Sequence, residues 1–205
     1  PEGPQGHNIA RNAAVLSKLG IKVAGTTINR YCASGLQSVA MAACQIQSGF
    51  SDCIIAGGVE SMSRAPFVMP KAETAFARSN QIFDTTIGWR FVNPAMQTIH
   101  NIDSMPETAD NVALDYAISR QDQDAFALQS QQRYAAADQA GVFADEILPV
   151  PMDHLAVPAN LVDRDEHPRP QVTLEKLAKL PGVNGRGSSV TAGNASGIND
   201  GAAAL

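Results

Sequence analysis

The stretch "TTINRYCASGLQSVAMAAC", residues 26–44, places a cysteine between a segment rich in β-branched residues and a segment of helical periodicity. Upstream, "IKVAGTTIN" (21–29) has the composition of a strand. Downstream, apolar residues recur every three or four positions, which predicts a helix over 33–49. Its many small residues favour close packing in the protein interior. Cys32 is therefore expected at the N-terminus of an interior helix.

A cysteine at this position has two interpretations. The unpaired N–H groups and the positive dipole end of a helix stabilise a thiolate, which would make Cys32 a nucleophile. Alternatively, a free cysteine packs as a small buried hydrophobe. The spacing alone leaves both interpretations open for Cys32. For Cys44 in the middle of the predicted helix and Cys53 in the next strand, only the second applies.

The elements on either side of this stretch predict an α/β fold. "DCIIAGGVES" (52–61) is a continuous apolar run bounded by turn residues, which is typical of a buried parallel strand. Together with 21–29 and 33–49, it forms a predicted βαβ unit. Before this unit, Asn8 is placed to cap a helix over 9–19.

The rest of the chain is less regular. Prolines interrupt 63–105, which we expect to leave the core as a long excursion. Capping and periodicity then predict helices over 107–117 and 120–140, and a short helix within 173–180.

Composition limits the class of protein. A chain of 205 residues that is 44% hydrophobic is long enough for one sizeable core, with room for an appended subdomain. A net charge of -5 argues against a nucleic-acid surface, and no apolar run is long enough to span a membrane. An odd number of cysteines, three, argues against a disulfide framework and favours a reducing compartment, the cytoplasm.

The histidines and the chain ends complete this survey. Every histidine lies in a polar or proline-rich stretch, so each is predicted to be solvated and none is an evident partner for a cysteine protease: His7, His100, His154 and His167. The chain begins without Met and stops inside an apolar run, so we expect a fragment of a longer protein.

Long motifs in the same order resemble the thiolase family of acetyl-CoA acyltransferases. They are "INRYCASGLQSVAMAACQI" (28–46), "IIAGGVESMSRAPF" (54–67) and "SVTAGNASGINDGAAAL" (189–205). "SRQDQDAFALQSQQRY" (119–134) resembles the helix of the family's loop domain, so the resemblance covers nearly the whole chain. It implies a five-layer αβαβα fold of two similar halves, with a loop domain that grips coenzyme A inserted into the first half.

The resemblance also implies a domain organisation. The chain would hold an incomplete N-terminal half, with a core formed by residues 1–62 and by the return segment 187–205. Residues 63–186 would form the inserted loop domain that binds coenzyme A.

For activity, the resemblance implies a nucleophilic Cys32 that attacks a 3-oxoacyl-CoA and carries the acyl group to CoA. The family's remaining groups lie in an Asn-Glu-Ala-Phe segment, a Gly-His-Pro histidine that activates the nucleophile and a Cys-x-Gly acid/base cysteine. None of these motifs occurs in residues 1–205. The isolated chain is therefore expected to have no turnover.

Coenzyme A contacts are implied where the motifs match. In "TAGNASGI" (191–198) the pantetheine positions are Ala192, Ser196 and Ile198, and Met105 matches a methionine at the floor of the active site. Arg169 falls where some thiolases hold the adenine end of CoA. An ordinary exposed charge remains an alternative for Arg169, and a hydroxyl serving a tight glycine turn remains one for Ser196.

The substrate class follows from finer resemblance. Ser104 stands where the biosynthetic acetoacetyl-CoA branch has a histidine, whereas 81–96 and 103–113 most resemble members that cleave 3-oxoadipyl-CoA to succinyl-CoA and acetyl-CoA. Candidate cations for the terminal carboxylate of that substrate are Arg64, Arg78 and Arg90.

Alternatives remain for the whole protein. One is an acetoacetyl-CoA or general fatty-acid thiolase, and another is a non-catalytic CoA-binding or assembly fragment. The family implies CoA as a substrate, no permanently bound cofactor, no metal, and a homodimer or homotetramer of the full-length chain.

Overall fold

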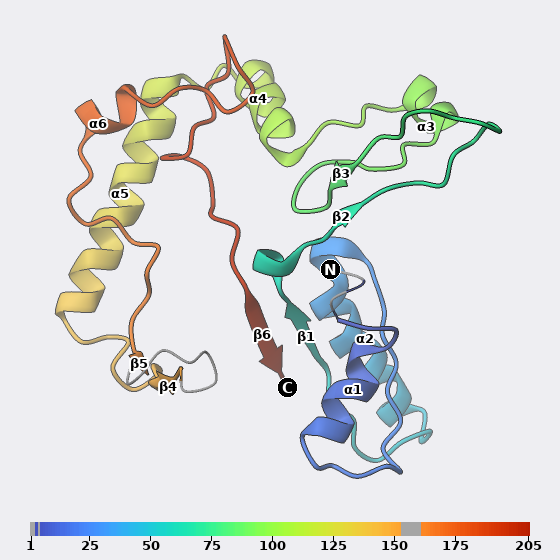
Figure 1. The fold of residues 1–205 in the computed structure, drawn as a ribbon. Helices are drawn as coiled ribbons and strands as arrows, with labels where there is room; N and C mark the ends of the chain where they lie inside the picture. Colours follow the sequence, from blue (N-terminus) through green and yellow to red (C-terminus); the bar gives the residue numbers. More distant parts are fainter. Residues whose placement is uncertain (1–2, 4, 153–160) are drawn as a thin grey trace. The chain divides into compact units, whose positions relative to one another are not determined.

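The computed structural model describes residues 3, 5–152 and 161–205 of the chain (Figure 1). They form two compact units. Unit 1 comprises Pro1–Ile102 and Ile198–Leu205, and unit 2 comprises Asp103–Gly197. The domain boundaries expected from the sequence, after residues 62 and 186, stay a prediction. His154 lies outside the described residues.

Unit 1 contains three helices, two 3-10 turns and four short strands among its described residues. In chain order they are α1 (Ile9–Leu16), η1 (Tyr31–Ala33), α2 (Ser34–Gln47), β1 (Gly57–Glu60), η2 (Met62–Arg64), β2 (Phe67–Val68), β3 (Phe83–Asp84), α3 (Pro94–Ile99) and β6 (Gly201–Ala204). The predicted first helix and the predicted helix around residue 40 are therefore confirmed as α1 and α2.

Local hydrogen bonds explain where α1 begins and ends. The side chain of Asn8 accepts a hydrogen bond from the backbone N–H of Arg11, which caps the helix as predicted. The helix ends at Leu16, three residues earlier than expected. Lys18 has already left the helical region, with a φ of 65°, and Gly20 follows in a left-handed conformation with a φ of 97°.

The predicted strand over 21–29 is wrong, because residues 21 and 22 form a turn and residues 23–29 take part in no β-ladder. Side chains of α1 and of its N-cap residue donate hydrogen bonds to the carbonyl groups of this segment instead. Arg11 donates to the carbonyl oxygens of Ile21 and Val23, and Asn8 donates to that of Gly25. A strand needs a second backbone as its partner, and here the partner is a set of side chains.

The predicted parallel βαβ unit is also wrong. Strand β1 (Gly57–Glu60) pairs antiparallel with β6, with Gly57 opposite Ala204 and Glu60 opposite Gly201. Asp200, just before β6, accepts hydrogen bonds from both the backbone N–H and the hydroxyl of Ser63. The chain therefore returns to unit 1 beside its own earlier strand, which fixes the register of this pair.

Unit 2 is built on two longer helices. Its elements in chain order are α4 (Met105–Asp115), α5 (Arg120–Gln139), β4 (Val150–Pro151), β5 (Leu161–Val162) and α6 (Leu174–Ala178). They confirm the three helices predicted for this part of the chain. Ser104 and Glu107 form a reciprocal capping box at the start of α4, and Ser119 caps α5 by accepting from the N–H of Asp122.

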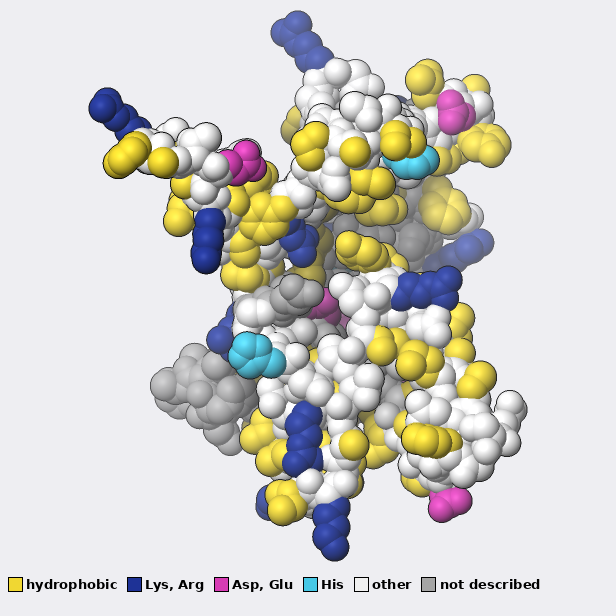
Figure 2. Space-filling model, turned by 90° about the vertical axis from the view of Figure 1, so that its right-hand side faces the viewer, with side chains coloured by type: hydrophobic (Ala, Val, Ile, Leu, Met, Phe, Trp, Pro, Cys, Tyr) yellow, Lys and Arg dark blue, Asp and Glu magenta, His cyan; other side chains and the backbone are white. Residues whose placement is uncertain are grey.

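The prediction of one sizeable core is wrong for the described residues. The buried hydrophobic side chains are small or few: Ala14, Ala42, Ala56, Leu177 and Val190. Hydrophobic side chains are instead spread over the face seen in Figure 2. Helix α2 shows the same pattern, because only Ala42 is buried and Leu36 is 77% exposed, so its predicted interior position is wrong.

None of the helices formed by the described residues is both long and apolar enough to cross a membrane.

Candidate active site

Cys32 lies in η1, the 3-10 turn that leads directly into α2. Its predicted position at a helix N-terminus is therefore confirmed. The side chain is exposed, so the buried-hydrophobe interpretation does not hold for it. That interpretation is wrong for Cys44 and Cys53 as well, because both are exposed. Among the three thiols, Cys32 alone combines exposure with the first turn of a helix.

The backbone around Cys32 leaves one hydrogen-bond donor unused. Ala33, the N-cap residue of α2, makes no side-chain cap. The N–H of Ala33 donates to the carbonyl oxygen of Arg30, at 3.1 Å, and that of Ser34 donates to the carbonyl oxygen of Tyr31. The N–H of Cys32 has no hydrogen-bond partner among the described residues. A free N–H beside an exposed thiol suits the developing oxyanion of a tetrahedral intermediate.

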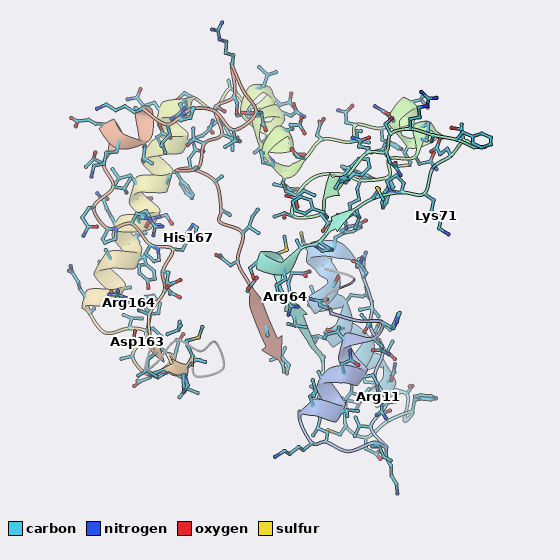
Figure 3. All side chains as sticks on the ribbon, viewed as in Figure 1. Arg11, Arg64, Lys71, Asp163, Arg164 and His167 are labelled. Carbon is cyan, nitrogen blue, oxygen red and sulfur yellow. The ribbon has the colours of Figure 1, made fainter. Side chains whose placement is uncertain are left out.

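A cavity of about 490 Å³ lies within unit 2. Helix α5 forms one wall with Ala127 and Gln131, and the segment 167–172 passes over it. Figure 3 shows His167 beside α5. The remaining lining comes from α6 and from the turn 192–195. The volume lies within the range of small-molecule binding sites.

The cavity brings together two of the residues that the motifs implied for CoA. Arg169 and Ala192 both line it, and Ser196 directly follows the lining residue Ala195. Met105, the exposed first residue of α4, does not line it. Ile198 is exposed and belongs to unit 1, as does Cys32.

Arg169 gives the cavity part of its positive charge. Its guanidinium Nη1 donates to the carbonyl oxygens of Glu166, His167 and Pro168, at 2.6, 2.8 and 3.1 Å. Its backbone N–H donates to the side chain of Gln131 on α5, at 2.8 Å. The segment is thus tied to α5, and the guanidinium is held within the segment that lines the cavity. Arg169 itself is exposed, and its role in binding CoA stays a prediction.

The turn that carries Ala192 is held by a buried polar network that the sequence did not reveal. Thr191 is fully buried, and its N–H donates to the side-chain oxygen of Asn194 at 2.7 Å. Asn194 in turn donates to Asp124, which is 3% exposed and pairs with Arg120 at 2.8 Å. Arg120 also donates to the carbonyl oxygens of Leu177 and Leu180, so its side chain joins α5 to the end of α6. The turn is joined to α5 through Asp124 and Asn194.

Gly193 lets this turn approach α6 closely. A Cβ atom at this position would lie 2.5 Å from side-chain carbons of both Leu177 and Leu180. A larger residue here would therefore displace both leucine side chains, of which Leu177 is buried. Glycine allows the observed close approach, which keeps the backbone of the turn at the wall of the cavity.

Asp110 of α4 holds the segment that leads into this turn. Its carboxylate accepts from the N–H groups of Ser189 and Val190, at 2.8 and 3.2 Å, and from the side chain of Asn184 at 2.7 Å. Burial alone raises the pKa of Asp110, but hydrogen bonds from the side chains of Ser188 and Asn184 and from the two N–H groups outweigh it and hold the pKa at about 2.

The lowered pKa of Asp110 predicts an acid-sensitive contribution to stability. A carboxyl whose pKa falls on folding stabilises the protein above its unfolded pKa, and this stabilisation is lost as the pH falls from about 4 to about 2. Allowing for solvent screening, we expect about 1 kcal/mol at neutral pH. Asp110→Asn should therefore lower the urea midpoint at pH 6, and the difference from the native protein should shrink at pH 3. Asp115→Asn, at the exposed end of the same helix, is the control.

The missed residues had only weak signals in the sequence. Asn194 is part of the "TAGN" motif, and Asp124 is part of "SRQDQDA", but neither motif indicates which residue its member will bind.

In the part of the chain that the structure describes, no group of three or more His, Cys, Asp or Glu residues could hold a metal ion.

Comparison with known proteins identifies relatives of this chain. The family model described as "Thiolase, N-terminal domain" matches residues 2–205. A beta-ketoadipyl-CoA thiolase of Pseudomonas putida is 58% identical over 203 residues, which cover 99% of this chain and 50% of that protein. The 3-oxoadipyl-CoA/3-oxo-5,6-dehydrosuberyl-CoA thiolase of Escherichia coli K12 is 55% identical and covers 99% of this chain and 51% of that protein.

A solved structure shows the same fold. Human mitochondrial 3-ketoacyl-CoA thiolase in complex with CoA matches with a TM-score of 0.76 and 36% identity, covering 95% of this chain and 47% of that one. The predicted thiolase fold is thereby confirmed. The chain spans about half the length of the curated relatives that it matches. The match over residues 2–205 nevertheless takes in both units, and the chain belongs to the thiolase family.

Proposed function

We propose that the full-length protein is an acyltransferase that cleaves 3-oxoadipyl-CoA with CoA into succinyl-CoA and acetyl-CoA. The observation that carries the proposal is the exposed thiol of Cys32 at the first turn of α2, beside its own unpaired N–H. Relatives at 55 and 58% identity whose names specify this substrate support the choice of acyl group. We expect a cytoplasmic homodimer or homotetramer.

The reaction has two transfers on Cys32. The thiolate attacks the C3 carbonyl carbon of the substrate, and the oxyanion that forms is stabilised by the N–H of Cys32. The C2–C3 bond then breaks, its electron pair becomes the enolate of acetyl-CoA, and that enolate takes a proton at C2. The succinyl group stays on Cys32 as a thioester until the thiolate of a second CoA attacks it and releases succinyl-CoA. The family supplies the proton-transfer groups from motifs that residues 1–205 do not contain.

The cavity of unit 2 is the proposed binding site for the CoA portion. Arg169 and Lys176 supply positive charge for phosphate groups, and the backbone of the turn at Ala192 supplies a surface for the pantetheine chain. Ser196, Ile198 and Met105 are proposed to contact the same molecule.

The terminal carboxylate distinguishes the proposed substrate from its alternatives. The candidate cations Arg64, Arg78 and Arg90 are exposed, and none makes an ion pair within the described part of unit 1. Figure 3 shows Arg64 in the turn that follows β1. A charge-assisted hydrogen bond contributes about 1.5–3 kcal/mol, which corresponds to a rate difference of roughly tenfold to a hundredfold.

The test compares two substrates of equal chain length. The full-length protein is expected to show a kcat/KM for 3-oxoadipyl-CoA at least about tenfold higher than for 3-oxohexanoyl-CoA, which lacks the carboxylate. Thiolysis is followed by mass spectrometry of the CoA products. Equal values for the two substrates would favour a general fatty-acid thiolase. Activity restricted to acetoacetyl-CoA would favour the acetyltransferase alternative, and no thiolysis at all would leave only CoA binding or assembly.

A further inference from the structure

The residue before Cys32 is held in a strained conformation. Tyr31 has a φ of 50°, in the left-handed region that side-chain-bearing residues rarely adopt. Tyr31 is 82% exposed, so packing of the side chain does not force this conformation. Some other interaction must therefore hold the backbone here.

A single hydroxyl group supplies most of that interaction. Ser34 Oγ accepts from the N–H of Arg30 at 2.7 Å and donates to the carbonyl oxygen of Tyr31 at 2.6 Å. The N–H of Tyr31 itself donates to the side chain of Asn29 at 2.9 Å. The two peptide groups that flank Tyr31 are thus each bound by a side chain, one by Asn29 and the other by Ser34. Ser34 also binds the N–H of Arg30, one peptide group earlier in the chain.

The two hydrogen bonds of the Ser34 hydroxyl form a clamp on the backbone around Tyr31. This clamp determines where the helical backbone begins. If Tyr31 relaxed to a right-handed φ, the helical backbone could continue backwards by another residue or more, and the N–H of Cys32 would find a carbonyl partner within the helix. In the observed conformation, η1 begins at Tyr31, and the N–H of Cys32 stays unpaired among the described residues.

We propose that Ser34 is a positioning residue for Cys32. It holds Tyr31 in the left-handed conformation, so that the thiol and the N–H of Cys32 face the substrate together. This inference rests on the proposed role of Cys32 as the acylated nucleophile. Ser34 itself touches no reacting atom, and its effect passes through the backbone of Tyr31.

The experiment uses the full-length protein with three variants in α2. Ser34→Ala removes both hydrogen bonds, and Ser34→Thr keeps the hydroxyl. Ser38→Ala is the matched control, because the Ser38 hydroxyl lies in the same helix and donates to the carbonyl oxygen of Gly35 at 2.7 Å, not to that of Tyr31. The measurements are kcat, the KM for CoA, and the rate at which iodoacetamide labels Cys32, followed by peptide mapping.

Ser34→Ala is expected to lower both kcat and the labelling rate of Cys32 by about tenfold or more, since small misplacement of a reacting group has effects of this size. The KM for CoA should stay within about threefold, because the proposed CoA cavity lies in unit 2. Ser34→Thr should restore most of the rate, and Ser38→Ala should leave it unchanged. Unchanged kcat and labelling in Ser34→Ala would overturn the proposal.

A second pair of variants removes the need for the clamp. Glycine adopts a positive φ without strain, so Ser34→Ala should have a much smaller effect on labelling when Tyr31→Gly is also present. An effect of the same size in both backgrounds would show that Ser34 does not act through Tyr31, which overturns the proposal even if Ser34→Ala alone folds poorly. Turnover that persists in Cys32→Ala would instead refute the proposed nucleophile, a different result from failure of the clamp.

Discussion

Cys32→Ala is expected to lower the kcat of the full-length protein by about a million-fold, the effect of removing a nucleophile that works together with its partners. The substitution deletes one exposed sulfur atom, so the fold and the proposed CoA cavity should remain intact. The measurement is thiolysis of 3-oxoadipyl-CoA, with binding of CoA determined separately by calorimetry. CoA should still bind with an affinity close to that of the native protein.

The other two thiols are matched controls, because both are exposed and neither lies at a helix N-terminus. Cys44→Ala and Cys53→Ala should each keep kcat within about twofold. After incubation with substrate alone, the native protein should carry a succinyl group on the peptide that contains Cys32. An acyl group found on another residue would contradict the assignment.

Asp124→Ala is expected to destabilise unit 2 by about 3 kcal/mol and to loosen the turn beside the cavity. The carboxylate is 3% exposed, pairs with Arg120 and accepts from Asn194, so its removal leaves both partners without their acceptor. Hydrogen–deuterium exchange is the suitable measurement because it reports local opening. Backbone amides over 189–195 should exchange about a hundredfold faster than in the native protein.

Asp138→Ala is the control for this substitution, since Asp138 lies on the same helix and is exposed. It should leave exchange over 189–195 unchanged. If Asp124→Ala behaved like Asp138→Ala, the polar network would not be what holds the turn. A conservative Asp124→Asn substitution should give an intermediate result, because the amide oxygen still accepts from Asn194 but cannot form the ion pair with Arg120.

The sequence predicted the helices well because their signals are local. Asn8 and Ser119 each bind an N–H three residues ahead, and the stop at Gly141 depends on the φ of one residue, 72°. The strands were predicted less well, because their pairing depends on distant parts of the chain. The partner of β1 lies at 201–204, and the segment 21–29 forms hydrogen bonds with side chains of α1 in place of a ladder. Composition identifies an extended segment but not what it will pair with.

The candidate site shows the same limit. The motif around Cys32 was sufficient to place the thiol at a helix start, because both features lie within a few residues. The support of the turn at Ala192 could not be predicted. Asp110 binds a residue 79 positions later, and Asp124 binds one 70 positions later. A single sequence does not indicate which of the acidic residues on a helix will form hydrogen bonds with a turn so far along the chain.

These long separations have a consequence for the order of events in folding. A contact across 70 or more residues forms only after the intervening chain has closed on itself, which costs conformational entropy and is slow compared with helix formation. Helices α4 and α5 should therefore form early, and the turn over 189–195 should dock on them late. The same turn should also be the first to detach. Any small molecule that occupies the cavity would hold the last-formed contacts closed, and so would raise the melting temperature of unit 2 with its concentration.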